Sequence, residues 1–216
     1  WTSDSCTVHP AIINLCIDQE KLVSSHCIIS DDLNHDVGMV YKIQETLIQF
    51  LKDNFPNITD VHYYSDGCAG QYKNKYNFMN LSLHEKDFKI KGQWSFFATN
   101  HGKTECDGIG GTVRRLTRKA SHQRPLDNQI LTATTFFQFC KSNIAKINFH
   151  FISKDSVDQT RCKLTKRFEG LKTLPGTRSF HNYRPLDCFG TIEARRVSCD
   201  EKPSHIQLEE RINFKC

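Results

Sequence analysis

Two acidic residues, Asp66 and Asp107, stand close to the points where the sequence predicts that strands of a sheet end. Asp66 directly follows a short apolar strand at residues 58–65, and Asp107 opens the basic helix that comes after a strand at residues 93–99. In layered α/β sheets, functional side chains gather outside the carboxyl ends of the strands. Carboxylates at neighbouring strand ends can converge on hard divalent cations, which prefer oxygen ligands. Asp66 and Asp107 are therefore the predicted catalytic and metal-binding residues, with Mg²⁺ or Mn²⁺ as the cofactor.

The residues around both carboxylates favour phosphodiester chemistry on a nucleic acid. Two Mg²⁺ ions held roughly 3.5–4 Å apart can activate water or a 3′-hydroxyl and stabilise the leaving oxygen. Glycines next to the two acids would let a polynucleotide backbone approach closely: Gly67, Gly70, Gly108, Gly110 and Gly111. Cationic residues nearby are the predicted nucleic-acid contacts: Lys73, Lys103, Arg114, Arg115, Arg118 and Lys119. His101 could position a phosphate or a metal-bound water, with a structural role as the alternative.

Each of these features also has a plain structural explanation. Asp-Gly is a common turn dipeptide, so Asp66 or Asp107 taken alone could be a turn former or a helix N-cap. A cluster of Lys and Arg could be the solvated face of a helix. Trp94, Phe96 and Phe97 are predicted to lie in the core, with base stacking as the less favoured alternative. The joint occurrence of two strand-end acids with adjacent glycines and cations favours a functional site.

The positive charge of the chain is unevenly distributed. The net charge is +5, and residues 101–125 alone contain six Lys or Arg against two acids, which is a local charge of +4. A second basic stretch covers residues 161–196. Localised positive charge suits a polyanionic partner, since each neutralised phosphate releases counterions. DNA is the predicted partner.

Ten cysteines leave three interpretations open. A disulfide framework would use an even number of them, but a chain of this length does not need such cross-links. Structural zinc would need close ligand pairs, and the nearest approach is Cys6 with His9. Cys16, Cys27 and Cys140 lie in apolar runs, where a reduced thiol behaves as a small hydrophobic group. Reduced thiols in the core are the favoured interpretation.

The bulk composition is that of a globular protein with a sizeable core. The chain has 216 residues, of which 38% are hydrophobic and 25% charged. No stretch approaches the roughly 18 apolar residues of a membrane span. The first residues also lack the basic and apolar regions of a signal peptide. We therefore expect no membrane partner and a nuclear or cytoplasmic location, and the sequence leaves a homo-oligomer open.

Hydrophobic periodicity predicts strands that alternate with helices. Strands are predicted at residues 7–17, 22–30, 58–65, 93–99, 146–152 and 191–198, the first two joined by a hairpin turn at 18–21. Helices are predicted from an N-cap at Asp36 to a stop at 54–56, and at 72–84, 112–121, 127–143 and 155–171. A glycine-rich corner is predicted at 106–111, before the basic helix. This order favours a layered α/β sheet over a helix bundle or a β-sandwich.

Three segments resemble a family of uncharacterised animal proteins derived from DNA transposases with a ribonuclease-H-like DDE/D core. They are YYSDGCAGQYKNKYNFMNLSLHEKDF, FFATNHGKTECDGIGGTVRRLTRKAS and GTRSFHNYRP. The resemblance covers most of the chain, and its most specific blocks are SDG-x-x-x-QYKN and HGK-x-x-CDG-x-GG. It implies that Asp66 is the second catalytic carboxylate and Asp107 the third. Glu105 is the alternative third acid, because that position is often Glu in DDE enzymes.

The resemblance implies a ribonuclease-H-like mixed sheet flanked by helices. That fold opens with three antiparallel strands and carries its first catalytic Asp on the first of them, whereas only two strands are predicted here before the first helix. The first strand and its acid are therefore expected upstream of residue 1. Asp31 and Asp32 follow the wrong strand for that role.

Two domains and two functions follow from these observations. Residues 1–125 are predicted to be the partial ribonuclease-H-like core, and residues 126–216 an α/β extension packed on it. The first hypothesis is a transposase-derived, metal-dependent polynucleotidyl transferase or nuclease acting on DNA. The alternative is a catalytically inactive transposase remnant that binds nucleic acid or serves as an interaction module.

Overall fold

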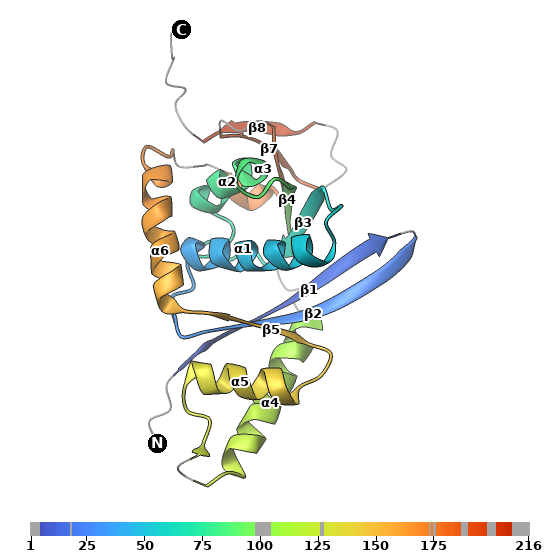
Figure 1. Cartoon of the computed structure of the whole chain (residues 1–216). Helices are drawn as coiled ribbons and strands as arrows, with labels where there is room; N and C mark the ends of the chain where they lie inside the picture. The colour runs from blue at the N-terminus through green and yellow to red at the C-terminus, as the bar shows by residue number, and fades with distance from the viewer. Residues whose placement is uncertain are drawn as a thin grey trace. The chain divides into compact units, whose positions relative to one another are not determined.

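The structure, a computed structural model, describes residues 5–17, 19–97, 105–125, 128–172, 174, 176–186, 190–197 and 202–208. These residues form a mixed α/β protein with two mixed sheets, as the sequence predicts at the level of fold class (Figure 1). The strands are β1 (Thr7–Ile17), β2 (Glu20–Ser30), β3 (Asp60–Ser65), β4 (Lys91–Phe96), β5 (Asn148–Ile152), β6 (Asn182–Pro185), β7 (Thr191–Arg195) and β8 (Ser204–Gln207). The helices are α1 (Val37–Asn54), α2 (Lys75–Ser82), α3 (His84–Phe88), α4 (Glu105–His122), α5 (Ala133–Asn143) and α6 (Lys154–Thr165). None of the helices in the described ranges combines the length and apolar character that crossing a membrane requires.

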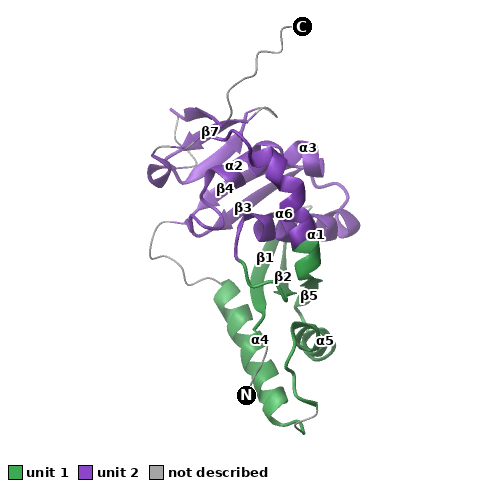
Figure 2. Cartoon of the chain, turned by 90° about the vertical axis from the view of Figure 1, so that its left-hand side faces the viewer, with its two compact units in different colours: residues 1–34, 103–157 green, residues 35–102, 158–216 purple. Residues whose placement is uncertain are grey.

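The chain divides into two compact units, each built from two separate stretches of sequence (Figure 2). Unit 1 contains Trp1–Asn34 and Lys103–Val157, and unit 2 contains His35–Gly102 and Asp158–Cys216. The domain boundary expected between residues 125 and 126 falls inside unit 1. A division into core and extension at that point stays a prediction.

Unit 1 is organised around a long β-hairpin. β1 and β2 pair antiparallel along their full length, with Thr7 opposite Ser30. Gln19 lies in the turn with a φ of 68°, in the left-handed region. β5 pairs with β2 in parallel, with His26 opposite Asn148. The predicted hairpin is confirmed, and its turn is tighter than the expected 18–21.

One face of this sheet forms the core of unit 1 with α4 and α5. Cys27 and Ile29 of β2 are two residues apart and therefore point to the same face. They are buried together with Val113 of α4 and Cys140 of α5. Burial, with Cys140 nearby, raises the pKa of the Cys27 thiol to about 12. Cys27 and Cys140 are core thiols as predicted, whereas Cys16, near the tip of the hairpin, is exposed.

Helix α1 of unit 2 begins and ends at the residues that the sequence predicts. Asp36 is the N-cap, and its Oδ1 accepts a hydrogen bond of 3.0 Å from the backbone N–H of Met39. The helix ends at Asn54, two residues before Pro56, which cannot continue it. Its buried side includes Tyr41 and Ile48, in a cluster with residues of α3 and α6.

Unit 2 contains the five-stranded sheet β3-β4-β6-β7-β8. β3 and β4 are parallel, and the other neighbours are antiparallel. Phe78 of α2 packs with Trp94, Phe96 and Tyr183 on one face of this sheet. The burial of Trp94 and Phe96 confirms two of the three predicted core aromatics. Phe97 is 39% exposed, so its assignment to the core is wrong.

Helix α4 starts seven residues earlier than predicted. The segment at 106–111, expected to be a glycine-rich corner, lies in the first turns of the helix. Ile109 and Gly110 are buried there, and a Cβ added to Gly110 would lie 3.5 Å from Cγ of Pro10 in β1. Packing against the hairpin thus outweighs the low helix propensity of glycine.

Other elements differ from the sequence prediction mainly in their boundaries. The predicted helix at 72–84 is replaced by α2 and the short α3, and the helix expected from residue 127 begins at Ala133. Thr132 and Thr135 form a capping box at the start of that helix. Strands β6 and β8 were not expected from the sequence, because each contains only four residues.

Candidate functional site

Asp66 begins the loop that joins β3 to α2 in unit 2. Its Oδ1 accepts a hydrogen bond of 3.0 Å from the backbone N–H of Cys68, which is an Asx turn. The preceding Ser65 accepts a bond of 2.9 Å from Nε1 of the buried Trp94, so the strand end is fixed to the core. Asp66 itself is exposed. Asp66 therefore forms a turn, and its exposed carboxylate is also accessible to a cation.

Lys73 lies in the same loop. Its Nζ is 5.3 Å from the centre of the Phe96 ring, within range of a cation–π interaction. A Cβ added to Gly67 would lie 3.6 Å from Cδ of Lys73, so the lysine side chain passes next to the residue after Asp66. Partial burial lowers the pKa of Lys73. The loop that Asp66 begins thus also carries a cation, whose side chain lies against Phe96.

Backbone hydrogen bonds make this loop compact. The carbonyl oxygen of Cys68 accepts from the N–H groups of Tyr72 at 2.8 Å and Lys73 at 3.1 Å. Nδ2 of Asn74 donates to the carbonyl oxygen of Ala69 at 2.7 Å. The side-chain oxygen of Asn74 caps α2 by accepting from the N–H of Asn77 at 2.9 Å. The SDG-x-x-x-QYKN block therefore forms a closed turn between strand and helix.

Asp107 lies in the first turn of α4, in unit 1, and is exposed. Glu105, the alternative third acid, lies in the same turn. Acidic side chains at this end of a helix interact favourably with the partial positive charge of the free backbone N–H groups. Lys103 and His101, which the sequence places just before the helix, lie outside the described residues.

The two predicted metal ligands belong to different compact units. Asp66 is in unit 2 and Asp107 in unit 1. Within the part of the chain that the structure describes, no group of three or more His, Cys, Asp or Glu side chains could hold a metal ion. Among the described residues there is thus no such cluster, and binding of Mg²⁺ or Mn²⁺ stays a prediction.

Helix α4 has one buried side and one cationic side. Ile109, Val113 and Thr117 are buried against the rest of unit 1. Because successive helical residues are about 100° apart, the opposite side carries positions 114, 115, 118 and 119. These are the predicted nucleic-acid contacts Arg114, Arg115, Arg118 and Lys119, and all four are exposed. None of the four has an acidic ion-pair partner in the described ranges.

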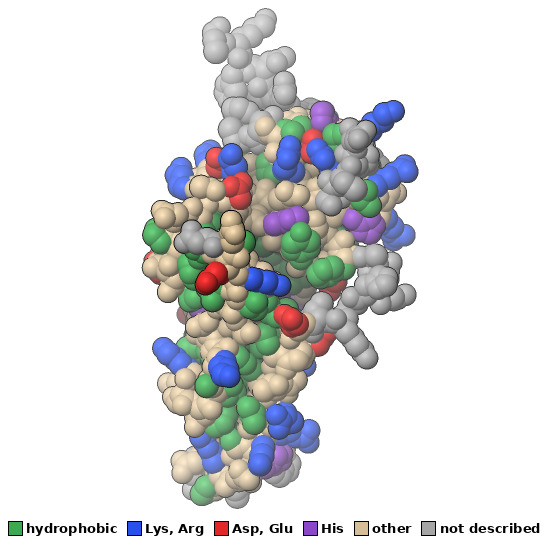
Figure 3. All heavy atoms as spheres, turned by 90° about the vertical axis from the view of Figure 1, so that its right-hand side faces the viewer, with side chains coloured by type: hydrophobic (Ala, Val, Ile, Leu, Met, Phe, Trp, Pro, Cys, Tyr) green, Lys and Arg blue, Asp and Glu red, His purple; other side chains and the backbone are tan. Residues whose placement is uncertain are grey.

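The cationic side of α4 is open to a ligand. Gly108 and Gly111, on the same side of the helix, have no atom within 4 Å of an added Cβ. Figure 3 shows Lys and Arg side chains gathered at the lower end of the molecule in that view. Among the described residues of unit 1, this side of the helix is thus exposed from Gly108 to Lys119.

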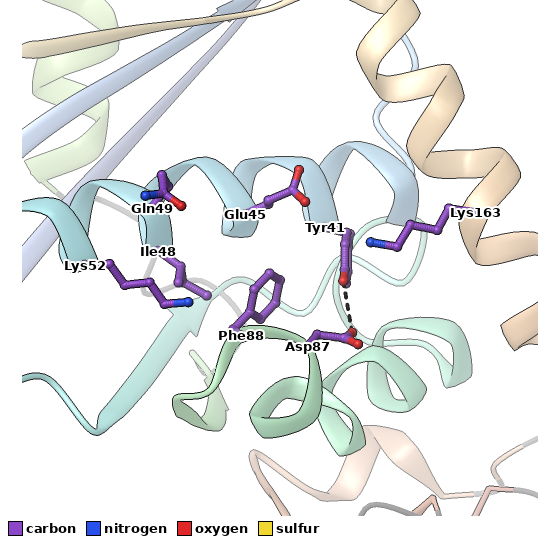
Figure 4. A pocket seen from close by; sticks show the side chains of 8 residues that line it. All are labelled: Tyr41, Glu45, Ile48, Gln49, Lys52, Asp87, Phe88 and Lys163. Carbon is purple, nitrogen blue, oxygen red and sulfur yellow. Dashed lines mark hydrogen bonds between the residues drawn. The ribbon is translucent and has the colours of Figure 1, made fainter. Parts of the chain in front are cut away.

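A small pocket in unit 2 contains none of the predicted site residues (Figure 4). It has a volume of about 200 Å³ and lies between α1, α3 and Lys163 of α6. Of its two carboxylates, Glu45 accepts from Lys42 at 2.6 Å, and Asp87 accepts from the Tyr41 hydroxyl at 2.9 Å and from Arg167 at 2.7 Å and 3.1 Å. Burial and then Asp87 raise the pKa of Tyr41. Both carboxylates of the pocket therefore already have a cationic partner.

A polar network on the other face of the five-stranded sheet was missed by the sequence analysis. Nε2 of His62 lies 2.8 Å from Oγ of Ser95, and Nδ2 of Asn182 donates to the same oxygen at 2.9 Å. The Tyr64 hydroxyl lies 2.9 Å from Nδ1 of His62. The alternation His-Tyr-Tyr-Ser in β3 could have indicated that His62 and Tyr64 share a face.

The chain belongs to the family described as a domain of unknown function (DUF8701), which matches residues 1–198. No curated protein and no solved structure matches the sequence. The family match includes residues of both compact units. The loop after β3 and helix α4 are therefore both within the family's shared sequence.

Proposed function

We propose that this chain is a nucleic-acid-binding domain that contacts DNA through the cationic side of α4. The observation that carries the proposal is the row of four exposed cations on one helix, without acidic partners in the described residues. Like charges so close together repel one another in the free protein, and a polyanion relieves that repulsion. Binding to DNA phosphates also releases condensed counterions. The resemblance to transposase-derived proteins supports DNA over other polyanions.

The test compares DNA binding by the wild type and a variant of α4. Replacing Arg114, Arg115 and Arg118 by Gln removes three charges and keeps good helix formers. We expect duplex affinity, measured by fluorescence anisotropy at fixed salt, to fall about 10- to 100-fold. The matched control replaces Lys86, Lys89 and Lys91, which are exposed cations of unit 2, by Gln. An equal loss in both variants would mean that α4 contributes only to overall charge.

Metal-dependent phosphodiester cleavage is a second candidate function. It is supported by the exposed carboxylate of Asp66 at the carboxyl end of β3, with Lys73 in the same loop. In this proposal the chain is a transposase-derived nuclease with a ribonuclease-H-like core. Asp66 and Asp107 would then be ligands of Mg²⁺ or Mn²⁺. The bound ions would supply Lewis acidity and an activated water.

The cleavage test uses two aspartates of the same strand region. Asp66 follows β3, and Asp60 is the exposed first residue of that strand. If the second function is correct, wild type and Asp60→Asn cut DNA in the presence of Mn²⁺, whereas Asp66→Asn does not. Equal activity of all three proteins would remove Asp66 from the mechanism, and equal inactivity would leave DNA binding as the proposed function of the chain.

A further inference from the structure

The five-stranded sheet of unit 2 has a core face and an outward face. Tyr63 and Trp94 are opposite each other in the parallel register of β3 and β4 and pack in the core. Their strand neighbours therefore point the other way. On that outward face, Tyr64 lies opposite Ser95, and Ser95 lies opposite Asn182 of β6.

Aromatic rings lie in a row on this face and remain accessible. Tyr64 is 59% exposed and Phe97 is 39% exposed. Their ring centres are 6.2 Å apart with an angle of 25° between the planes, which is a stacked arrangement. The His62 ring continues the row, 4.1 Å from Tyr64 at 35°. Figure 3 shows histidine and hydrophobic side chains next to one another in the upper half of the view.

Hydrogen bonds hold two of these rings in place. The Tyr64 hydroxyl is bonded to Nδ1 of His62, and Nε2 of His62 is bonded to Oγ of Ser95. Nδ2 of Asn182 fixes Ser95 in turn. Partial burial lowers the pKa of His62, which favours the neutral ring. The rings are thus oriented before any ligand binds, which reduces the entropy lost on binding.

The outward face continues onto β6 and β7 with charged side chains. Glu193 of β7 is buried, with its Oε1 2.8 Å from Nε of Arg195. The Arg184 side chain, 3.8 Å from the same oxygen, is 53% exposed. On this part of the face, Glu193 thus lies against two guanidinium groups, and Arg184 supplies an exposed cation on β6. On β3, the exposed Asp60 shares the face of the aromatic row and lies opposite Lys91.

We propose that the outward face of β3, β4 and β6 binds single-stranded nucleic acid by stacking unpaired bases on Tyr64 and Phe97. Exposed aromatic rings beside cationic side chains are the elements of sequence-tolerant single-strand binding. A duplex does not fit this face, because its base faces are covered by stacking within the helix. The surface lies in unit 2 and uses no residue of α4, so the inference goes beyond the proposed function.

The experiment measures anisotropy with labelled oligomers of deoxythymidine and of uridine, each about 12 nucleotides long, and with a DNA duplex of the same length. Tyr64→Ala and Phe97→Ala should each weaken single-strand binding by about 5- to 150-fold and leave duplex binding unchanged. Tyr64→Phe keeps the ring but removes the hydroxyl that is bonded to His62, so it should retain most of the single-strand affinity that Tyr64→Ala loses. Tyr76→Ala removes a ring of α2 that is 38% exposed and serves as the matched control. The two oligomers show whether the ligand is DNA or RNA.

The outcomes separate this inference from the proposed function. If Tyr64→Ala and Phe97→Ala bind single strands as the wild type does, the inference is overturned, whatever the α4 variant does. The same follows if Tyr64→Phe loses as much affinity as Tyr64→Ala, because then the stacked ring is not the contact. A different outcome is that the variant with Arg114, Arg115 and Arg118 replaced by Gln binds duplex DNA as the wild type does, while Tyr64→Ala loses affinity for single strands. In that case only the proposed function fails.

Discussion

The backbone N–H of Cys68 donates a hydrogen bond of 3.0 Å to Oδ1 of Asp66. This bond gives Asp66 a structural role in the turn. Two different substitutions of Asp66 can distinguish that role from metal binding. Asn keeps the side-chain oxygen that closes the turn, whereas Ala removes it. The two substitutions therefore test different properties of the same residue.

We expect Asp66→Ala to lower the free energy of unfolding by about 0.5–1.5 kcal/mol, and Asp66→Asn to change it much less. Urea denaturation measures both. If the carboxylate also binds a cation, Mn²⁺ should raise the melting temperature of the wild type by mass action and should not raise that of Asp66→Asn. A melting temperature that Mn²⁺ leaves unchanged in both proteins would assign Asp66 to the turn alone.

A second prediction concerns the N-terminus of α1. Asp36 caps the helix and accepts hydrogen bonds of 2.8 Å and 3.1 Å from Arg161. Burial alone would raise the pKa of Asp36, but the bonds from Arg161 and Met39 hold it below its usual range. Asp36→Ala should cost about 1–2 kcal/mol in the free energy of unfolding. Asp158→Ala, which removes the other acid bonded to Arg161 at 2.7 Å, is the control and should cost less.

Histidine burial in unit 1 predicts a loss of stability in mild acid. His26 is completely buried and its Nδ1 lies 3.0 Å from Nε2 of His150. Burial, and then the neighbouring His150, lower the pKa of His26 to about 4. Because this pKa lies below the value of about 6.5 in the unfolded chain, the unfolded state binds more protons between these values. Stability contributed by the neutral ring is therefore present above pH 6.5 and is lost as the pH falls toward 4.

The size of this effect can be measured by urea denaturation at neutral pH and at about pH 5. We expect His26 to account for about 2 kcal/mol of the difference in the free energy of unfolding. His26→Gln removes the titrating group and should reduce the difference by that amount. The same pH dependence in wild type and variant would contradict the assignment to His26.

Replacing Gly92 or Gly108 by alanine should change the free energy of unfolding in opposite directions. A Cβ on Gly92 would lie 2.6 Å from Cγ of His84, whose ring is held by Ile90 and Tyr63. Gly92→Ala should therefore destabilise unit 2 by about 1–3 kcal/mol. Gly108 lies in α4 with open space around it, so Gly108→Ala should stabilise by up to about 1 kcal/mol. A destabilising Gly108→Ala would show that the segment at 106–111 is not helical.

The sequence predicts the elements well where local patterns determine them. The hairpin follows from two long β-rich runs, and α1 follows from its apolar spacing between Asp36 and Pro56. The predicted start of α4 was wrong because glycine indicates a turn in the local sequence. The burial of Ile109 against β1 depends on residues distant in the sequence. Strands β6 and β8 are too short to show an alternation. The pairing of such strands depends on neighbours distant in the sequence.

The candidate site was predictable to a similar extent. The exposed cations of α4 follow from the cluster of Lys and Arg after Asp107. The exposed position of Phe97 was predictable from strand alternation, because Phe97 follows Phe96 and points to the opposite face from Trp94 and Phe96. The bonds that join His62, Ser95 and Asn182 depend on the register of three strands, which the sequence does not specify.

The salt dependence of DNA binding tests the central claim most directly. Each phosphate contact on duplex DNA contributes about 0.9 to the slope of log K against log salt concentration. If Arg114, Arg115 and Arg118 contact phosphates, replacing all three by Gln should make the slope shallower by about 2.7. The control variant of Lys86, Lys89 and Lys91 should keep the slope of the wild type. A slope that the α4 variant leaves unchanged would contradict DNA binding by this helix.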